Sequence, residues 1–257
     1  MALGNTMIDF HSHVLPHIDD GARRTDMAVA MLEESKRQGV TTIVCTPHYY
    51  GKTRSPEQFI AKRKESYNHL APRIPEGITL RLGAEVYFNA DMVTSFDDLA
   101  TLCIEGTRYI MLELPFTPTY PERLWKKLES FIMDSGCTPI IAHVDRYPAV
   151  LKKPSILKRL TDMGCLLQLN VESLETKGVK GFALAALKKG LIHAVGSDMH
   201  NMSDRAPNLK ILPVALQQNG LPAELAQNVF DAEYAILSNA PVEIRPGKIS
   251  KIFGKFF

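Results

Sequence analysis

The stretch MIDFHSHVLPHIDDG, residues 7–21, joins a short apolar run to a segment crowded with side chains that can bind metal ions. His11 and His13 are two residues apart, so in an extended backbone their side chains point to the same side and can bind one ion or two neighbouring ions. Asp20 adds a carboxylate in the loop that follows. The stretch therefore predicts a first strand that ends at a metal site.

Short apolar or β-branched runs recur along the chain and alternate with longer segments of helical periodicity, which is typical of an α/β fold with a parallel sheet. The seven strands are predicted at residues 7–11, 41–46, 79–85, 109–114, 139–144, 165–170 and 192–198. Helices are predicted at residues 25–39, with Thr25 as the N-cap, and at 55–70, 120–136, 153–164 and 179–190. A (β/α) barrel commonly reaches 257 residues as one domain, so we expect a single domain over 1–257.

Metal-capable side chains recur at the carboxyl ends of the predicted strands, where a parallel barrel gathers its active site. The nine candidate ligands are His11, His13, Asp20, His48, Glu85, Glu113, His143, Asp198 and His200. A catalytic zinc ion typically takes three protein ligands, so nine imply two or three ions. Imidazole and carboxylate without thiolate favour manganese, zinc or iron over copper(I) or over magnesium alone.

Two arginines follow candidate ligands closely. Arg146 lies three residues after His143, and Arg205 lies five residues after His200. A guanidinium group can bind two phosphate oxygens at once. Neighbouring metal ions can activate water and bind both the attacking and the leaving oxygen at phosphorus. Hydrolysis of a phosphate ester is therefore the predicted chemistry, although a surface ion pair with an adjacent aspartate is the alternative reading of each arginine.

Other polar residues of the same types are assigned structural roles. His193 falls at the opposite end of its strand from Asp198, His69 lies on a helix, and His17 is expected in an exposed loop. Asp9 is two residues before His11 and on the same face, so it is a candidate for orienting a ligand histidine rather than for binding metal.

Composition excludes several classes of protein. Apolar residues make up 45% of the chain and the formal charge is +2, so the chain can bury a full core and offers little electrostatic reason to bind nucleic acid. The four cysteines form no CxxC pair and are expected to be reduced. The first residues lack the pattern of a signal peptide and no apolar run could span a bilayer, so a cytoplasmic protein is expected.

The region after residue 206 is predicted to form one or two helices and a tail, RPGKISKIFGKFF. Its mixture of aromatic and lysine residues would suit docking on a partner or a membrane surface. Packing of the tail on its own domain is the preferred interpretation.

The motifs HSHVLPHIDDG, TPHYY, GAEVYF, LELPF, AHVDRYP and GSDMHN, in this order, resemble the PHP (polymerase and histidinol phosphatase) metal-dependent hydrolases. Within that superfamily they resemble the bacterial tyrosine phosphatases of capsular and exopolysaccharide loci, from about residue 7 to about residue 205. The resemblance implies a distorted (β/α)7 TIM-like barrel, the PHP fold. It also implies a cluster of three ions often assigned as manganese, with zinc, iron or magnesium as alternatives.

The implied reaction is dephosphorylation of the tyrosine-rich tail of an autophosphorylating bacterial tyrosine kinase that controls capsule or exopolysaccharide synthesis. The family's metal ligands fall on the nine positions above, and its substrate-binding and catalytic arginines fall on Arg146 and Arg205. This sequence departs from the pattern at Asp145, where glutamate is common, and at Tyr49 and Tyr50, which are expected at the mouth of the site.

A thiol-based tyrosine phosphatase needs the motif Cys-x5-Arg, in which an arginine follows the cysteine six residues later. None of the four cysteines meets this requirement: the residues six positions after Cys45, Cys103, Cys137 and Cys165 are Gly51, Tyr109, His143 and Val171. A tyrosine phosphatase with this sequence must therefore use metal ions and water. Two alternatives remain: a small-molecule phosphoesterase similar to histidinol phosphatase, and, more remotely, a scaffold that binds a partner without catalysis.

Overall fold

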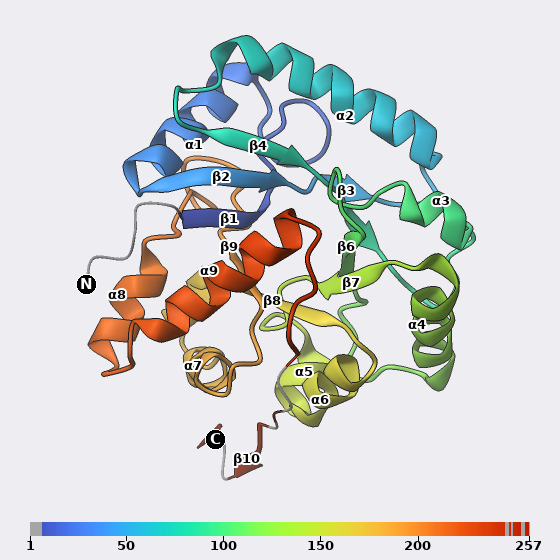
Figure 1. Cartoon of the computed structure of the whole chain (residues 1–257), viewed down its shortest axis with the longest axis vertical. Coiled ribbons are helices and arrows are strands. Elements are labelled where there is room, and N and C mark those ends of the chain that lie inside the picture. Colours follow the sequence, from blue (N-terminus) through green and yellow to red (C-terminus); the bar gives the residue numbers. More distant parts are fainter. Residues whose placement is uncertain (1–6, 245–246, 248, 253–254, 257) are drawn as a thin grey trace.

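The structure is a computed structural model that describes residues 7–244, 247, 249–252 and 255–256. Strands and helices alternate along most of the chain, as the hydrophobic pattern predicts (Figure 1). The strands are β1 Met7–Ser12, β2 Val40–Cys45, β3 His48–Tyr49, β4 Thr79–Leu82, β5 Glu85–Tyr87, β6 Tyr109–Glu113, β7 Thr138–Ile141, β8 Leu166–Asn170, β9 Ala194–Gly196, β10 Lys251–Ile252 and β11 Lys255–Phe256. The α-helices are α1 Thr25–Arg37, α2 Pro56–Leu70, α3 Phe96–Ala100, α4 Glu122–Ser135, α5 Pro148–Lys152, α6 Ser155–Asp162, α7 Lys180–Lys188, α8 Ile211–Gln218 and α9 Glu224–Leu237, and short 3-10 helices cover Ala71–Arg73 and Val171–Leu174.

The strands β1 to β9 pair in parallel and form a curled sheet. Its hydrogen-bonded order is β1-β2-β4 in one part and β3-β5-β6-β7-β8-β9 in the other. Strands β6 and β8 are buried along their whole length, as expected for parallel strands covered on both faces. All these strands therefore deliver their carboxyl ends to the same side of the sheet.

One predicted strand region is interrupted, and one short strand was not predicted. The region 79–85 divides into β4 and β5, and a short strand, β3, follows β2 after Pro47. Proline has no backbone N–H and cannot donate to the ladder, so the pairing of β2 with β4 ends there. The carbonyl of Cys45 accepts a hydrogen bond from the N–H of Gly83, and the carbonyl of Pro47 accepts one from the N–H of Glu85. The second part of the sheet begins after these contacts, with the pairing of β3 and β5.

The first and last strands of the curled sheet meet at their carboxyl ends. The N–H of Asp198 donates to the carbonyl of His11 over 2.8 Å, and the N–H of His13 donates to the carbonyl of Met199 over 3.0 Å. An isolated bridge joins Ser12 to Met199. The two ends of a chain segment nearly 190 residues long are thus held side by side.

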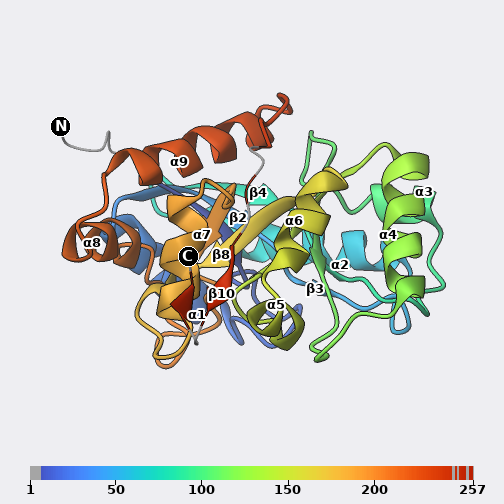
Figure 2. The same ribbon diagram turned by 90° about the horizontal axis from the view of Figure 1, so that it is seen from below.

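The concave interior of the sheet is filled by apolar side chains from six strands, sealed by helix α9. The members of this buried cluster are Ile8, Phe10, Val44, Ile104, Tyr109, Met111, Ile140, Ala142, Leu166, Ala194 and Ile236. Helix α9 crosses one end of the sheet, with the other helices around the outside (Figures 1 and 2). The hydroxyl of Tyr109, the first residue of β6, donates to the carbonyl of Ala240, so the end closed by α9 is that of the strand amino termini, opposite the candidate site.

Local sequence explains where several helices begin and end. Helix α2 starts with a capping box, in which Ser55 and Gln58 satisfy each other's backbone N–H groups. Helix α4 ends at Gly136, whose φ of 68° suits a left-handed C-cap. Thr25 was expected to cap α1, but Thr25 lies inside the helix and the N-cap is Arg24, which makes no side-chain capping bond.

The region after residue 206 contains α8 and α9, as predicted. In the described part of the tail, Phe256 packs on Phe182 of α7, with 5.5 Å between ring centroids, so this residue contacts its own domain. Residues 245, 246, 248, 253, 254 and 257 of the predicted tail lie outside the described residues. Within the described ranges, none of the helices combines the length and the apolar character needed to traverse a lipid bilayer.

The four cysteines carry free thiols. Cys45, Cys137 and Cys165 are buried, in agreement with a role as core residues. The Sγ atoms of Cys103 and Cys137 lie 3.5 Å apart.

The close contact of β9 with β1 gives a prediction about stability. A Cβ atom at Gly196 would lie 2.5 Å from Cβ of His11 and 2.8 Å from its backbone nitrogen, so Gly196→Ala must push the two strands apart. We expect the free energy of unfolding to fall by about 1–3 kcal/mol in urea denaturation of the metal-free protein. The matched control is Gly181→Ala on α7, where the new Cβ would meet Phe256 at an ordinary 3.6 Å; equal losses in both variants would contradict the prediction.

Candidate metal centre

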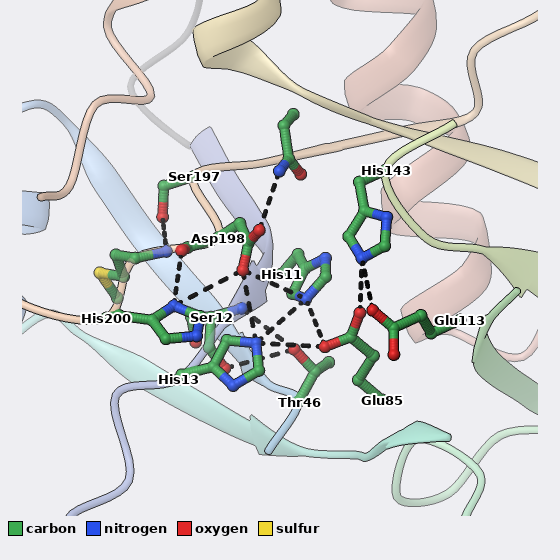
Figure 3. Close-up of polar contacts among 12 residues, drawn as sticks. His11, Ser12, His13, Thr46, Glu85, Glu113, His143, Ser197, Asp198 and His200 are labelled. Atoms are coloured by element: carbon green, nitrogen blue, oxygen red, sulfur yellow. Dashed lines mark hydrogen bonds and ion pairs between the residues drawn. The ribbon is translucent and has the colours of Figure 1, made fainter. Parts of the chain in front are cut away.

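The nine candidate ligands come from seven different places in the chain and meet at the carboxyl edge of the curled sheet. His11 lies in β1, His48 in β3, Glu85 in β5 and Glu113 in β6. His13, Asp20, His143, Asp198 and His200 lie in the loops that follow β1, β7 and β9. Figure 3 shows the rings of His11, His13 and His200 directed toward Asp198, and the ring of His143 directed toward Glu85 and Glu113.

The carboxylate of Glu85 lies at the middle of the cluster. Its Oε2 atom is 3.3 Å from Nε2 of His11, 3.3 Å from Nε2 of His13 and 2.9 Å from Nδ1 of His48. Its Oε1 atom is 2.7 Å from Nε2 of His143. Glu85 is buried, so one carboxylate faces four imidazoles away from bulk water.

The carboxylate of Asp198 holds the opposite side of the cluster. Its Oδ1 atom lies 3.6 Å from Nε2 of His11 and 3.4 Å from Nε2 of His13. These two imidazole nitrogens are themselves 3.2 Å apart. Nitrogen lone pairs and carboxylate oxygens thus converge on one small volume, which is the donor set that a divalent transition-metal ion requires.

The exposed rim of the cluster is formed by Asp20. Its side chain is 65% exposed, and its Oδ1 atom lies 3.5 Å from Nε2 of His48 and 3.4 Å from Nε2 of His200. The two histidines are nearly buried below it. Asp20 therefore stands where solvent meets the cluster.

Eight of the nine residues form three groups whose ligand atoms lie within 4.8 Å of one another. The groups are His13 with Asp20, His48 and His200; His11 with His13 and Asp198; and His48 with Glu85 and Glu113. Two ligand atoms bound to one ion at about 2.0–2.2 Å are at most about 4.4 Å apart, so the spacing suits metal coordination after small movements. His143 is outside these groups, and its Nε2 atom lies 3.5 Å from Glu113 and closer to Glu85.

Several atoms of the cluster are buried without a hydrogen-bond partner. They are Oε2 of Glu85, Nδ1 of His48, Nδ1 of His143 and Nε2 of His200. Buried polar atoms are almost always satisfied in native proteins, and here the atoms of Glu85, His48 and His200 have ion-pair contacts but no hydrogen bond, which is a donor set that suits the binding of cations. The residues present fit a metal cluster on this observation alone.

The electrostatics of the cluster lead to the same conclusion. Burial raises the pKa of the Asp198 carboxyl, but the charges of His11 and His13 outweigh burial and hold it well below its usual value. Burial lowers the pKa of His143, but hydrogen bonds from its ring to Glu113 and Glu85 raise it to about 9. The buried carboxylates thus demand positive charge, which either protons on imidazole or bound metal ions can supply.

Two of the candidate ligands have a backbone conformation that most residues avoid. The φ angles of His143 and Asp198 are 29° and 53°. Such left-handed conformations in residues other than glycine cost about 1–3 kcal/mol and occur preferentially at functional sites. At Asp198 the turn directs the carboxylate into the cluster while the backbone N–H still pairs with His11.

Both candidate phosphate-binding arginines contact Asp198 rather than the aspartates beside them in sequence. Nη1 of Arg146 is 2.9 Å from Oδ2 of Asp198, and Nη2 of Arg205 is 2.7 Å from Oδ1. Their side chains are 44% and 31% exposed, and both line one pocket together with Asn170. Each guanidinium group therefore reaches the edge of the cluster while keeping N–H groups available to a ligand.

Three residues that position the candidate ligands were missed from the sequence. Asp19 accepts a hydrogen bond from Nδ1 of His13 at 2.7 Å and from the backbone N–H of His48 at 3.0 Å. Gln168 lies 3.2 Å from Nδ1 of His11, and the amide of Asn170 donates to Asp198 over 2.9 Å. A signal existed, because Gln168 and Asn170 are polar residues two apart in an otherwise apolar buried strand.

The interpretation of Asp9 needs correction. Its carboxylate accepts from the backbone N–H and the hydroxyl of Ser197 and from the backbone N–H of His11 at 3.4 Å. The ring of His11 instead faces Gln168. Asp9 therefore fixes the backbones of β1 and the β9 loop rather than the orientation of an imidazole.

Tyr49 and Tyr50 both line a pocket beside Asp20 and His48, as expected. Neighbouring residues of a strand face opposite sides, so Tyr49 is buried against Phe59, whereas Tyr50 is 42% exposed and its ring lies 5.5 Å from that of His48 in a tilted arrangement. His17 is exposed and His69 lies on α2, as expected.

His193 lies outside the cluster, as predicted, and is buried. Its Nδ1 atom accepts a hydrogen bond from the backbone N–H of Leu167, so the neutral ring carries its proton on Nε2. Burial lowers the pKa of His193 to about 4.

Curled parallel sheets that gather histidines and carboxylates at one edge are characteristic of metal-dependent hydrolases, and the fold and the cluster place this protein in that class. Residues 7–230 match the model of a family described as "Capsular polysaccharide synthesis, CpsB/CapC". The chain belongs to the CpsB/CapC family.

Named relatives agree with this assignment. The chain is 32% identical over 213 residues to the tyrosine-protein phosphatase CpsB of Streptococcus pneumoniae, which covers 79% of this chain and 87% of the relative. It is 32% identical over 263 residues to the tyrosine-protein phosphatase YwqE of Bacillus subtilis, covering 97% and 100%. Crystal structures of YwqE from Bacillus subtilis and CpsB from Streptococcus pneumoniae are described as those of unique metal-dependent tyrosine phosphatases. One chain from that work superposes on this protein with a TM-score of 0.79 and 27% sequence identity, and the match covers 96% of this chain and 100% of that one.

The contact between Asp19 and His13 gives a prediction about metal affinity. A carboxylate on the outer nitrogen of a ligand imidazole fixes its tautomer and increases its basicity, so Asp19→Asn should weaken metal binding about 10–100-fold. Competition with a metal-sensitive chelating dye measures this affinity directly. The control is Asp162→Asn on α6, whose carboxylate pairs with Lys158 at the surface; unchanged affinity in Asp19→Asn would refute the positioning role.

The buried imidazole of His193 gives a prediction about pH. Because its pKa is lower in the folded state, the unfolded chain binds the extra proton, and stability is lost as pH falls from about 6.5 toward about 4. Between pH 7.5 and 5 the loss attributable to His193 should be about 2 kcal/mol. Urea denaturation of metal-free wild type and His193→Gln at both pH values tests this, since the variant should show the smaller decline; parallel declines would contradict it.

Proposed function

We propose that this protein is a metal-dependent protein-tyrosine phosphatase that hydrolyses phosphotyrosine on an autophosphorylating bacterial tyrosine kinase controlling capsule or exopolysaccharide synthesis. The observation that carries the proposal is the convergence of two guanidinium groups on Asp198 at the edge of a buried histidine and carboxylate cluster. The names of the relatives support the substrate class.

The proposed metal ligands are His11, His13, Asp20, His48, Glu85, Glu113, His143, Asp198 and His200. Their grouping into three sets supports a three-ion cluster, and we propose manganese as the ion, with zinc, iron or magnesium as alternatives. When bound, the ions lower the pKa of water and act as Lewis acids toward the phosphoryl group.

The chain's own residues would bind and orient the substrate. Arg146 and Arg205 lie on one pocket and would hold the non-bridging phosphoryl oxygens through charge-assisted hydrogen bonds. Asp198 would keep both guanidinium groups beside the cluster. A phenol has a pKa near 10, so phenolate is a fairly good leaving group and needs less help from a general acid than an alkoxide does.

We further propose that the curled sheet is the distorted (β/α)7 barrel of the PHP fold. In this proposal residues 1–257 form one domain, with the motifs in 7–205 and the C-terminal helices and tail in 206–257. The meeting of β1 with the β9 loop supports a closed arrangement. A cytoplasmic location belongs to the same proposal.

The relatives' names do not favour the small-molecule phosphoesterase. A scaffold without catalysis is disfavoured by the complete set of buried polar residues, which are costly to keep unless they act.

Removal and return of metal tests the proposed function. Protein stripped with a chelator should lose hydrolysis of a phosphotyrosine peptide, because hydroxide at neutral pH requires the ions. Activity should return when manganese, zinc, iron or magnesium is added separately, with manganese most effective. The variant His11→Ala/His13→Ala should stay inactive with every metal, whereas His17→Ala, in the exposed loop nearby, should recover fully. Turnover of histidinol phosphate but not of the phosphotyrosine peptide would overturn the substrate assignment.

A further inference from the structure

One large apolar side chain stands exposed beside the polar cluster. Phe116 follows β6 in the loop that leads to α4, and it is 45% exposed. Its ring stacks on that of His143, with 5.6 Å between centroids and 27° between planes. An exposed phenyl ring on a candidate ligand histidine offers an apolar surface directly at the mouth of the site.

The position of Phe116 is fixed by its neighbours. The backbone N–H of Leu114 donates to the hydroxyl of Tyr147 over 2.9 Å, which holds the start of the loop. The ring of Tyr147 is buried and lies 5.3 Å from the ring of Phe116. Pro115, between Leu114 and Phe116, further restricts the backbone. The ring is therefore held in place before any ligand arrives.

Phe116 also touches the group proposed to bind phosphate. The Cζ atom of Arg146 lies 5.4 Å from the centroid of the Phe116 ring, while the guanidinium group contacts Asp198. An aryl phosphate carries its ring one oxygen away from phosphorus. A phosphoryl group held by Arg146 consequently places that ring next to Phe116.

The other half-exposed ring at the site is Tyr50, and its surroundings differ. Its ring is tilted by 34° against that of His48, with 5.5 Å between centroids, and lies 5.9 Å from the ring of Tyr87. Phe116 contacts both a histidine and the guanidinium group of Arg146. Tyr50 contacts a histidine and a second tyrosine. This difference selects Phe116 as the surface for the substrate ring.

We propose that Phe116 is the platform on which the phenyl ring of phosphotyrosine stacks, and that it sets the preference of this site for aryl over alkyl phosphate esters. The inference rests on the proposed function and specifies how its substrate is recognised. Aromatic pairs prefer offset-stacked or edge-to-face contact, and Phe116 keeps 45% of its surface exposed although it contacts His143 and Tyr147.

Calorimetric titration of the manganese-loaded protein with phenylphosphonate and methylphosphonate tests the proposal without turnover. The two ligands share the phosphonate group and differ in the ring. Phe116→Ala should weaken phenylphosphonate binding about tenfold and methylphosphonate binding less than about twofold. Phe116→Tyr should restore the preference for the ring, and Tyr234→Ala, which removes a 70% exposed ring on α9, should leave both affinities unchanged.

The outcomes separate this inference from the proposed function. Equal losses for both ligands in Phe116→Ala would mean that Phe116 only supports Arg146 or the fold, and would overturn the inference, as would no loss for either ligand. A wild type that hydrolyses phosphotyrosine but shows no dependence on Phe116 keeps the function and refutes the platform. A wild type without hydrolysis, in which phenylphosphonate binding still depends on Phe116, refutes the function and keeps the platform.

Discussion

The buried negative charge of Asp198 is the group on which the rest of the site depends. Its two oxygens contact the imidazoles of His11 and His13, the guanidinium groups of Arg146 and Arg205 and the amide of Asn170. A carboxylate with so little exposure must be compensated, and here imidazoles contact it on one side and guanidinium groups on the other. The same charge thus joins the cluster that would hold metal to the arginines that would hold phosphate. A strained backbone at Asp198 is the cost of placing it between them.

The overall architecture could be predicted because hydrophobic periodicity acts locally. Each strand from β1 to β9, apart from β3, lies in or overlaps a predicted region, and the α/β alternation follows from the same pattern. The breaks at Pro47 and Gly83 could not be placed, because they depend on which carbonyl each N–H finds in a neighbouring strand. The cap of α1 was also misplaced by one residue, because the helix begins at Thr25 and Arg24 is its N-cap although its side chain makes no capping bond.

The candidate site was predicted from one rule, that carboxyl ends of parallel strands share an edge, and all nine residues do meet there. This rule does not predict which of two neighbouring residues directs its side chain into the cluster. Of Asp19 and Asp20, both in the loop after β1, the first holds His13 from behind and the second faces the cluster, and spacing alone does not distinguish them. The same holds for Tyr49 and Tyr50, which both line the pocket beside Asp20, but the exact start of β3 decides which of the two rings is buried.

The junction of β1 with the β9 loop also has a consequence for biosynthesis. His11 and His13 leave the ribosome first among the cluster residues, whereas Asp198 and His200, which complete two of the three ligand groups, leave it last. The groups that contain Asp198 and His200 are consequently incomplete for most of translation, whereas the group of His48, Glu85 and Glu113 is complete once residue 113 has been made. If the protein binds metal as proposed, the full cluster would form only on the finished chain, and the ions it takes would depend on the metal pool that it meets after synthesis.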